Sequence, residues 1–159
     1  MNRRVVDILP HIISADTRVY LRAPLWGRQS TRSQERPMSS EQLLQAMDEA
    51  GVAKATILQP STCYGFDNSC VADAMAAHSD RFTAVFSGAM RAPDAPECIR
   101  HWVNHGLTGI RLFTAGGPIA GQRPVRDDPA TFPAWDCAAD LEIPVCVCAS
   151  KACRNCACC

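Results

Sequence analysis

The chain has 159 residues, about the size of one domain, and 47% of them are hydrophobic while 20% are charged. This composition is that of a globular protein and excludes a disordered chain. Sixteen basic residues balance sixteen acidic ones, so the net charge gives no reason to expect nucleic acid or an anionic membrane as a partner. No apolar run approaches the ~20 residues that span a bilayer, and the start lacks the apolar stretch of a secretory signal. We therefore expect a cytoplasmic protein.

Short apolar strands alternate with helical segments along the chain. Strands are predicted at residues 5–9, 55–58, 82–86, 107–113 and 143–148. Helices are predicted after Ser39, after Asp67 or Asn68, after Asp94, and over residues 132–141. The segments 14–37 and 115–129 are rich in Pro, Gly or polar residues and are predicted to be long loops.

The helix after Ser39 has the clearest local signals. Ser39 and Gln42 have the spacing of a capping box, in which each side chain bonds the backbone of the other residue. Leu43 and Met47 then recur at helical spacing, and Gly51 is a natural stop.

Strands separated by helices are typical of right-handed βαβ units and a parallel sheet. A doubly wound sheet and a (β/α)8 barrel both fit this alternation, although a complete barrel usually takes ~250 residues. There is no Gly-x-Gly-x-x-Gly after the first strand and no Walker lysine, so nucleotide binding has no support. In either fold, function is expected at the carboxyl ends of the strands.

Five segments near strand ends carry a further signal. They read DILPHIIS at 7–14, MDEAGVAKA at 47–55 with Gln59-Pro60 after it, YGFDNS at 64–69, DRF at 80–82 and GLTGIRL at 106–112. Taken in order, they resemble the amidohydrolase-2 family of the amidohydrolase superfamily, including its lactonase branch. The resemblance implies an α/β fold, a partial (β/α)8 TIM barrel of about five βα units in sequential parallel order. It also implies a hydrolase that acts on a lactone, amide or related bond of a small, often carboxylated, substrate.

The resemblance also implies roles for particular residues. In the family a His-x-His pair ends the first strand and holds a divalent ion such as Zn or Mn, which lowers the pKa of bound water to ~7, although some lactonases use no metal. Here Leu9 stands at the first position, so His11 is the expected metal ligand and catalytic residue. Arg111 is expected to bind a substrate carboxylate, and Tyr64 and Asn68 to line the mouth of the barrel.

Each of these residues has an alternative role. His11 could be a loop histidine with no function, Arg111 could form a structural ion pair, and Asp67 or Asn68 could cap a helix. His101 and His105 have the spacing of ligands on one helix face, but they also fit a solvated helix end. Purely structural roles, an ion pair or a helix cap, therefore remain alternatives to the functional roles at the strand ends.

Cysteine is concentrated at the end of the chain, where six of the ten lie between Cys146 and Cys159. We divide the chain into a barrel part, residues 1–149, and a Cys-rich tail, residues 150–159, which is not expected to belong to the fold. The tail could hold Zn(II) or Cu(I) through thiolates, or could result from out-of-register translation.

Three functions are therefore considered. The first is an amidohydrolase-like hydrolase, truncated relative to its family and impaired because the histidine of strand six and the aspartate of strand eight are missing. The second is a non-catalytic remnant of such an enzyme, and the third is a thiolate metal-binding protein. Open parallel edges on the first and fifth strands predict an edge-to-edge homo-oligomer.

Overall fold

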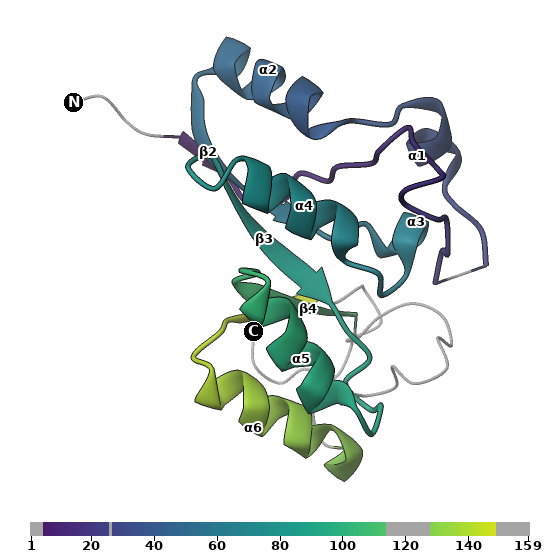
Figure 1. Ribbon diagram of the computed structural model, residues 1–159, viewed down its shortest axis with the longest axis vertical. Helices are drawn as coiled ribbons and strands as arrows, with labels where there is room; N and C mark the ends of the chain where they lie inside the picture. The colour runs from purple at the N-terminus through teal and green to yellow at the C-terminus, as the bar shows by residue number, and fades with distance from the viewer. Residues whose placement is uncertain (1–4, 26, 114–127, 149–159) are drawn as a thin grey trace, which may run out of the picture.

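The computed structural model describes residues 5–25, 27–113 and 128–148 (Figure 1). Its sheet consists of β1 (Val5–Asp7), β2 (Val52–Leu58), β3 (Phe82–Ser87), β4 (Gly109–Phe113) and β5 (Val145–Cys148). All neighbouring strands are parallel and follow one another in chain order. This order confirms the predicted partial (β/α)8 barrel and excludes a doubly wound sheet, in which β1 would lie inside the sheet and not at its edge.

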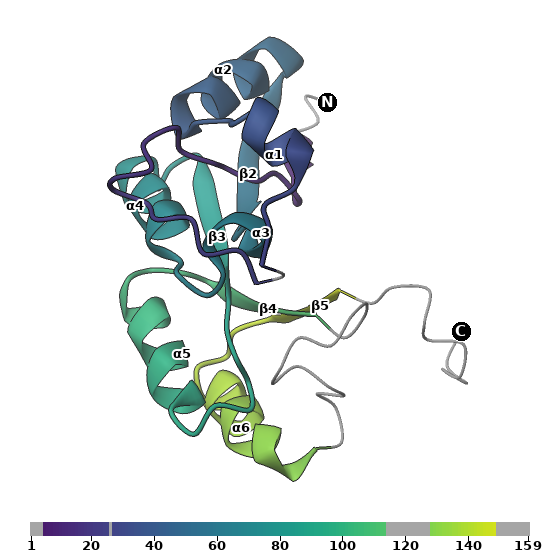
Figure 2. The same cartoon turned by 90° about the vertical axis from the view of Figure 1, so that its right-hand side faces the viewer.

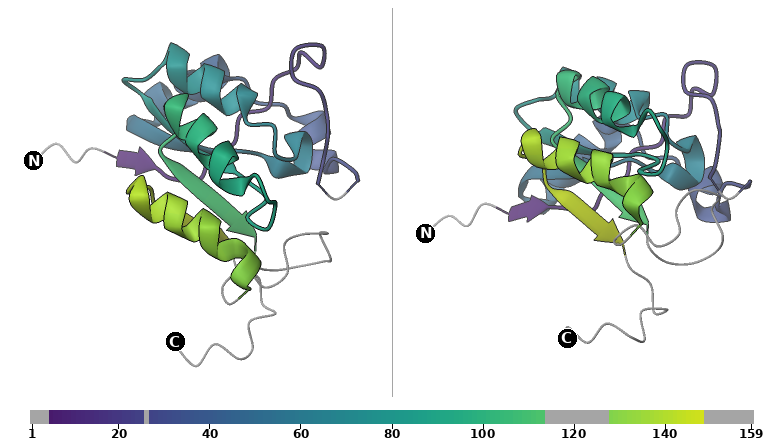
Figure 3. Two further views of the ribbon diagram at one scale, coloured as in Figure 1. Left: turned by 60° about the horizontal axis from the view of Figure 1, so that its bottom comes forward. Right: turned by 90° about the horizontal axis from the view of Figure 1, so that it is seen from below.

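Helices connect the strands. They are α1 (Thr31–Glu35), α2 (Ser40–Ala50), α3 (Ser61–Tyr64), α4 (Ser69–Ala77), α5 (Ala95–Asn104) and α6 (Phe132–Asp140), with a 3-10 turn η1 (Pro129–Thr131) before α6. In Figure 2, β4 and β5 run across the direction of β2 and β3, so the sheet curls strongly. The longer helices α2, α4, α5 and α6 lie along one side of this curled sheet, as the two views of Figure 3 show.

The hydrophobic core fills the space between the helices and the convex face of the sheet. Its largest buried side chains include Phe82, Phe86, Ile57, Ile99, Ile110 and Leu112. Because side chains alternate along a strand, Thr56 and Thr83 lie on the opposite, concave face, where their hydroxyl oxygens are 3.0 Å apart. The concave face is therefore partly polar, as expected of a surface that surrounds a site.

Local capping signals predicted α2 correctly. Ser39 Oγ accepts a hydrogen bond from the backbone N–H of Gln42 at 3.2 Å, and Gln42 Oε1 accepts one from Ser39 N–H at 2.9 Å. Gly51 ends the helix with a φ of 69°, in the left-handed region that favours glycine. The helices predicted after Asp67, after Asp94 and at Phe132 are also present, as α4, α5 and α6.

The predicted loops and the first strand need correction. Residues 14–37 are not all loop, because Ser30 caps α1 by accepting from Ser33 N–H at 3.3 Å. The helix α3 follows β2 immediately. Strand β1 ends at Asp7, two residues before the predicted end, because the Asp7 carboxylate accepts from Leu9 N–H at 3.1 Å. The Cys-rich tail, residues 150–159, and most of the segment 115–129 lie outside the described residues.

Candidate functional site

The carboxyl ends of β1, β2, β3 and β4 meet at one end of the curled sheet, which we call the mouth. Beyond β1 the chain still runs beside β2, because Leu58 N–H donates to Pro10 O at 2.9 Å. This contact places His11 next to the end of β2, with His11 Nδ1 at 2.7 Å from Leu58 O. On the other side, Ser87 of β3 and Arg111 of β4 are partners in register. The mouth therefore brings together His11 and Arg111, whose positive charge acts on the His11 ring.

The hydrogen bond to Leu58 determines the chemistry of the His11 ring. A carbonyl oxygen only accepts, so Nδ1 carries the proton and Nε2 of the neutral ring keeps its lone pair. Desolvation by the surrounding protein and the positive charge of Arg111 lower the pKa of His11, against the opposing effect of the bond to Leu58. At neutral pH His11 is therefore a neutral imidazole with Nε2 available as a base or a ligand.

Arg111 supplies the positive charge of the mouth. It is half-buried on β4, and its guanidinium carbon lies 4.7 Å from the centroid of the Phe113 ring. Positions two apart on a strand share a face, so Arg111 and Phe113 both belong to the concave side. A guanidinium stacked in this way keeps its planar set of donors in one orientation, which suits bidentate binding of a carboxylate.

Tyr64 lies near the mouth but is buried. Its hydroxyl oxygen accepts a hydrogen bond from Ser14 N–H at 2.9 Å, and the guanidinium carbon of Arg22 lies 4.8 Å from the centre of its ring. Burial raises the pKa of Tyr64 to about 12. These contacts attach the segment that follows His11 to α3, so Tyr64 has a structural role next to the mouth. Direct contact with a substrate stays a prediction for this residue.

Asn68 is completely buried and is bonded on both sides of its amide. Its amide nitrogen donates to Phe66 O at 2.9 Å and to Ser87 O at 3.1 Å, and its amide oxygen accepts from Ser87 N–H at 2.9 Å. The amide of Asn68 thus makes the same pair of hydrogen bonds to the Ser87 backbone that a residue of a neighbouring strand would make, at a position just beyond the end of β2. Asn68 does not cap α4 with its side chain. Asp67 does so instead, through a 3.0 Å bond from Ser69 N–H.

Gln59 also lies at the mouth. The sequence predicted no role for it, although Gln59-Pro60 is part of the family resemblance. Its side chain is completely buried, and its amide nitrogen donates to Asp67 O. Among the described residues, Gln59 Oε1 has no hydrogen-bond partner, and neither do the buried hydroxyls of Ser61 and Ser87. Unpaired buried polar atoms are uncommon in proteins, and these three cluster where β2 and β3 end.

The described residues do not form a metal site. No group of three or more His, Cys, Asp or Glu side chains that could hold an ion is found within residues 5–25, 27–113 and 128–148. A zinc site usually takes about three or four protein ligands, and His11 alone does not supply them. His101 and His105 lie exposed at the end of α5, with His105 Nδ1 at 2.8 Å from His101 O, which matches a solvated helix end. The exposed thiol of Cys146 lies in register with Arg111.

Comparison with known proteins agrees with this geometry. The model of the Amidohydrolase family (Amidohydro_2) matches residues 7–156, so the chain belongs to this family. No curated protein sequence matches the chain. No helix in the described ranges has both the length and the apolar character needed to cross a membrane.

Solved structures show the same fold. A probable 2-pyrone-4,6-dicarboxylic acid hydrolase from Acinetobacter baumannii, with citric acid bound, has a TM-score of 0.71 at 15% identity, over 91% of this chain and 49% of that one. A 5-carboxyvanillate decarboxylase from Novosphingobium aromaticivorans, with bound manganese and a nitrobenzoic acid, has a TM-score of 0.62 at 18% identity, over 91% and 50%. A 4-oxalomesaconate hydratase from Rhodopseudomonas palustris has a TM-score of 0.55 at 18% identity, over 92% of this chain and 52% of that one. The chain therefore spans about half the length of these structures.

Proposed function

We propose that this chain supplies the His11–Arg111 side of an amidohydrolase-type active site, which binds a small carboxylated substrate and hydrolyses a lactone, amide or related bond. The observation that carries the proposal is the pairing at the mouth of a neutral imidazole, with Nε2 available, and a stacked guanidinium. The bound citric acid of the Acinetobacter protein supports a carboxylate ligand for this fold.

The two residues have different tasks in this proposal. Arg111 binds a substrate carboxylate with two parallel hydrogen bonds and so fixes the orientation of the substrate. His11 then presents Nε2 to the reacting group, as a base for a proton or as a ligand. Asn68 and Tyr64 hold the surrounding backbone, through Ser87 and Ser14.

A divalent ion such as Zn or Mn is proposed from the family and from the manganese of the decarboxylase. Such an ion supplies an activated water when it is bound. The described residues offer only His11 toward it and do not fit a complete site, so no step is assigned to a metal. The same shortage of ligands favours a second candidate, a barrel half that binds carboxylates without catalysing a reaction.

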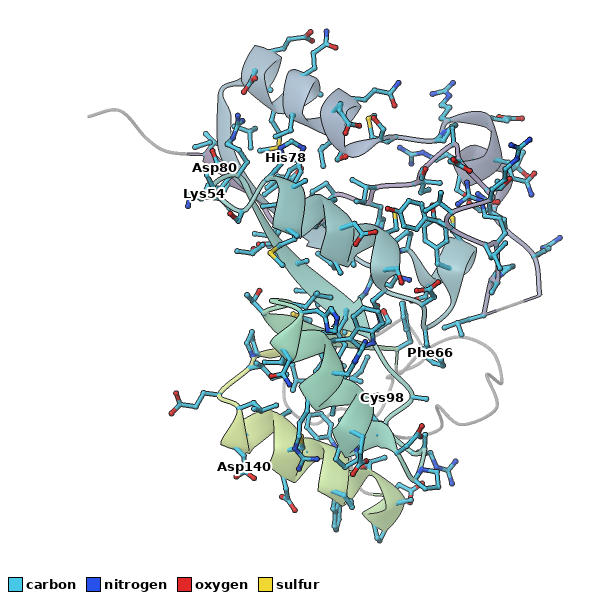
Figure 4. The ribbon with its side chains drawn as sticks, in the orientation of Figure 1. Lys54, Phe66, His78, Asp80, Cys98 and Asp140 are labelled. Atoms are coloured by element: carbon cyan, nitrogen blue, oxygen red, sulfur yellow. The ribbon has the colours of Figure 1, made fainter. Side chains whose placement is uncertain are left out.

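Titration with citrate, followed by isothermal calorimetry, tests the binding part of the proposal. Removing a charge-assisted hydrogen bond costs about 1.5–3 kcal/mol, so Arg111→Ala should weaken citrate binding by about tenfold or more. Lys54→Ala is the matched control, because Lys54 lies at the amino end of β2, away from the mouth (Figure 4). Equal affinity of wild type and Arg111→Ala would overturn the proposal.

Activity on a panel of carboxylated lactones then separates the two candidates. Turnover that is lost in His11→Ala, but kept in a His105→Ala control, supports the hydrolase. Citrate binding without any turnover supports the non-catalytic barrel half.

A further inference from the structure

A hollow lies on the convex, helix-covered face of the sheet, next to the carboxyl end of β3, whereas the mouth residue Arg111 lies on the concave face. Its volume is about 200 Å³, and it opens where the carboxyl end of β3 meets α5. The wall is mainly apolar and includes Phe66, Phe86, Met90, Ile99, Trp102 and Ile110. Two residues with exposed side chains, Asp94 and Cys98, line the same hollow and form its rim. Figure 4 shows Phe66 and Cys98 near the same end of β3.

The shape of this hollow is fixed by the segment between β3 and α5. Ala92 N–H donates to Ala89 O at 2.9 Å, and Ala95 N–H donates to Ala92 O at 3.0 Å, so the segment turns tightly. An ion pair of 2.8 Å between Arg91 and Asp128 attaches it to the start of η1. The small alanine side chains at 89, 92 and 95 leave the space between this segment and α5 open. Ligand pockets are usually preformed in this way.

The size and lining of the hollow limit what can fill it. An engineered apolar cavity of about 150 Å³ holds one benzene molecule, so a space of this volume accepts one six-membered ring with a small substituent. The rings of Phe66, Phe86 and Trp102 can pack against such a ligand edge to face or offset. At the rim, the Asp94 carboxylate accepts a hydrogen bond from a hydroxyl or amine and repels an anion.

We infer that this hollow binds one neutral monocyclic aromatic molecule with a hydrogen-bond donor, a phenol being the simplest, at a place separate from the mouth. Its charge preference is opposite to that proposed for the mouth, where Arg111 attracts carboxylates. The inference stands on the cavity between β3 and α5 and does not depend on the proposed hydrolase activity.

Protection of Cys98 from alkylation tests this inference directly. The chain is treated with N-ethylmaleimide with or without phenol, and the modification of each cysteine is followed by peptide mass spectrometry. Phenol should slow the alkylation of Cys98 by about tenfold at a concentration tenfold above its Kd. Cys146 is the internal control, because its exposed thiol lies on the concave side of β5. Benzoate should leave Cys98 unprotected, because Asp94 repels its charge.

Two variants complete the test. Ala92→Phe fills the hollow and should abolish protection by phenol, whereas Ala76→Phe, at an exposed position of α4, should not. Asp94→Asn removes the charge of the rim and alters the 3.8 Å contact between Cys98 Sγ and Asp94 Oδ2, so protection is compared with the alkylation rate of the same variant without ligand. In this variant benzoate should protect Cys98. The inference is overturned if phenol slows Cys98 and Cys146 equally or does not slow Cys98. It is also overturned if a folded Ala92→Phe variant is still protected, or if Asp94→Asn leaves benzoate without effect.

Discussion

The buried amide of Asn68 makes the sharpest prediction about stability. Its three hydrogen bonds join the segment between α3 and α4 to the last residue of β3, and no water reaches them, because Asn68 and Ser87 are 0% and 1% exposed. Asn68→Ala would leave the N–H and the carbonyl of Ser87 buried without these partners. A buried polar group left unpaired costs about 1–3 kcal/mol, so the two together should lower the free energy of unfolding by about 2–6 kcal/mol.

Asn68→Asp adds a dependence on pH to the same prediction. The carboxylate can still accept from Ser87 N–H, but it then faces the carbonyl oxygens of Ser87 and Phe66, which the amide nitrogen contacts in the wild type. Burial and these oxygens favour the protonated form and raise the pKa of the new carboxyl in the folded state. The folded state then binds more protons than the unfolded one, so the stability of the variant rises as pH falls from 7 toward the pKa of an ordinary aspartate, relative to wild type.

Urea unfolding followed by circular dichroism measures both effects. Asp67→Asn is the control, because the exposed Asp67 keeps its cap on Ser69 through the remaining side-chain oxygen and should lose less than about 1 kcal/mol. A loss below about 1 kcal/mol in Asn68→Ala, or an Asn68→Asp variant with the same pH profile as wild type, would refute the backbone-like role of this amide.

Three further predictions concern the mouth and the sheet edges. NMR titration should give a pKa of His11 below the usual value of about 6.5. The stability that neutral His11 contributes should then be lost as the pH falls below 6.5. A His11 pKa above 6.5 would contradict the desolvated, positively charged surroundings described above. Leu9→His alone should not raise lactone hydrolysis above that of wild type with added Zn or Mn, because two imidazoles still lack the remaining metal ligands; a strong increase in this variant would show that two histidines are sufficient. The 159-residue chain should associate through its edges, where Val5, Val6, Ile8 and Val147 are about half or more exposed, and a stable monomer in size-exclusion chromatography would exclude this.

The order of the sheet and the helix ends were predictable from the sequence because local or repeated signals encode them. The capping box at Ser39 and the stop at Gly51 involve residues within one helix, so spacing alone reveals them. The strand spacing was compatible with both a doubly wound sheet and a barrel, and the segments that resemble the amidohydrolase-2 family favoured the barrel. The rule that parallel strands point the same way predicts that the segment after β1 and the second half of β4 lie at the same end of the sheet, while the functional roles of His11 and Arg111 stay predictions.

The roles of buried polar residues could not be predicted in this way. Asn68 has the sequence position of a helix cap, yet its amide bonds to Ser87, which is 19 residues away and comes close only after the sheet has formed. Tyr64 is similar, because its partner Ser14 lies on the segment after β1. The helix α1 carries no apolar periodicity and depends on the Ser30 cap, so a search for hydrophobic patterns misses it.

The central claim is that His11 and Arg111 form one anion-binding mouth, and the pKa of His11 in the presence of citrate tests it most directly. A carboxylate bound by Arg111 brings negative charge close to the imidazole and favours its protonated form. NMR titration should therefore show that citrate raises the pKa of His11 in wild type and has no effect on the pKa of His11 in Arg111→Ala. A His11 pKa that citrate does not change in wild type, or changes equally in Arg111→Ala, would contradict the account.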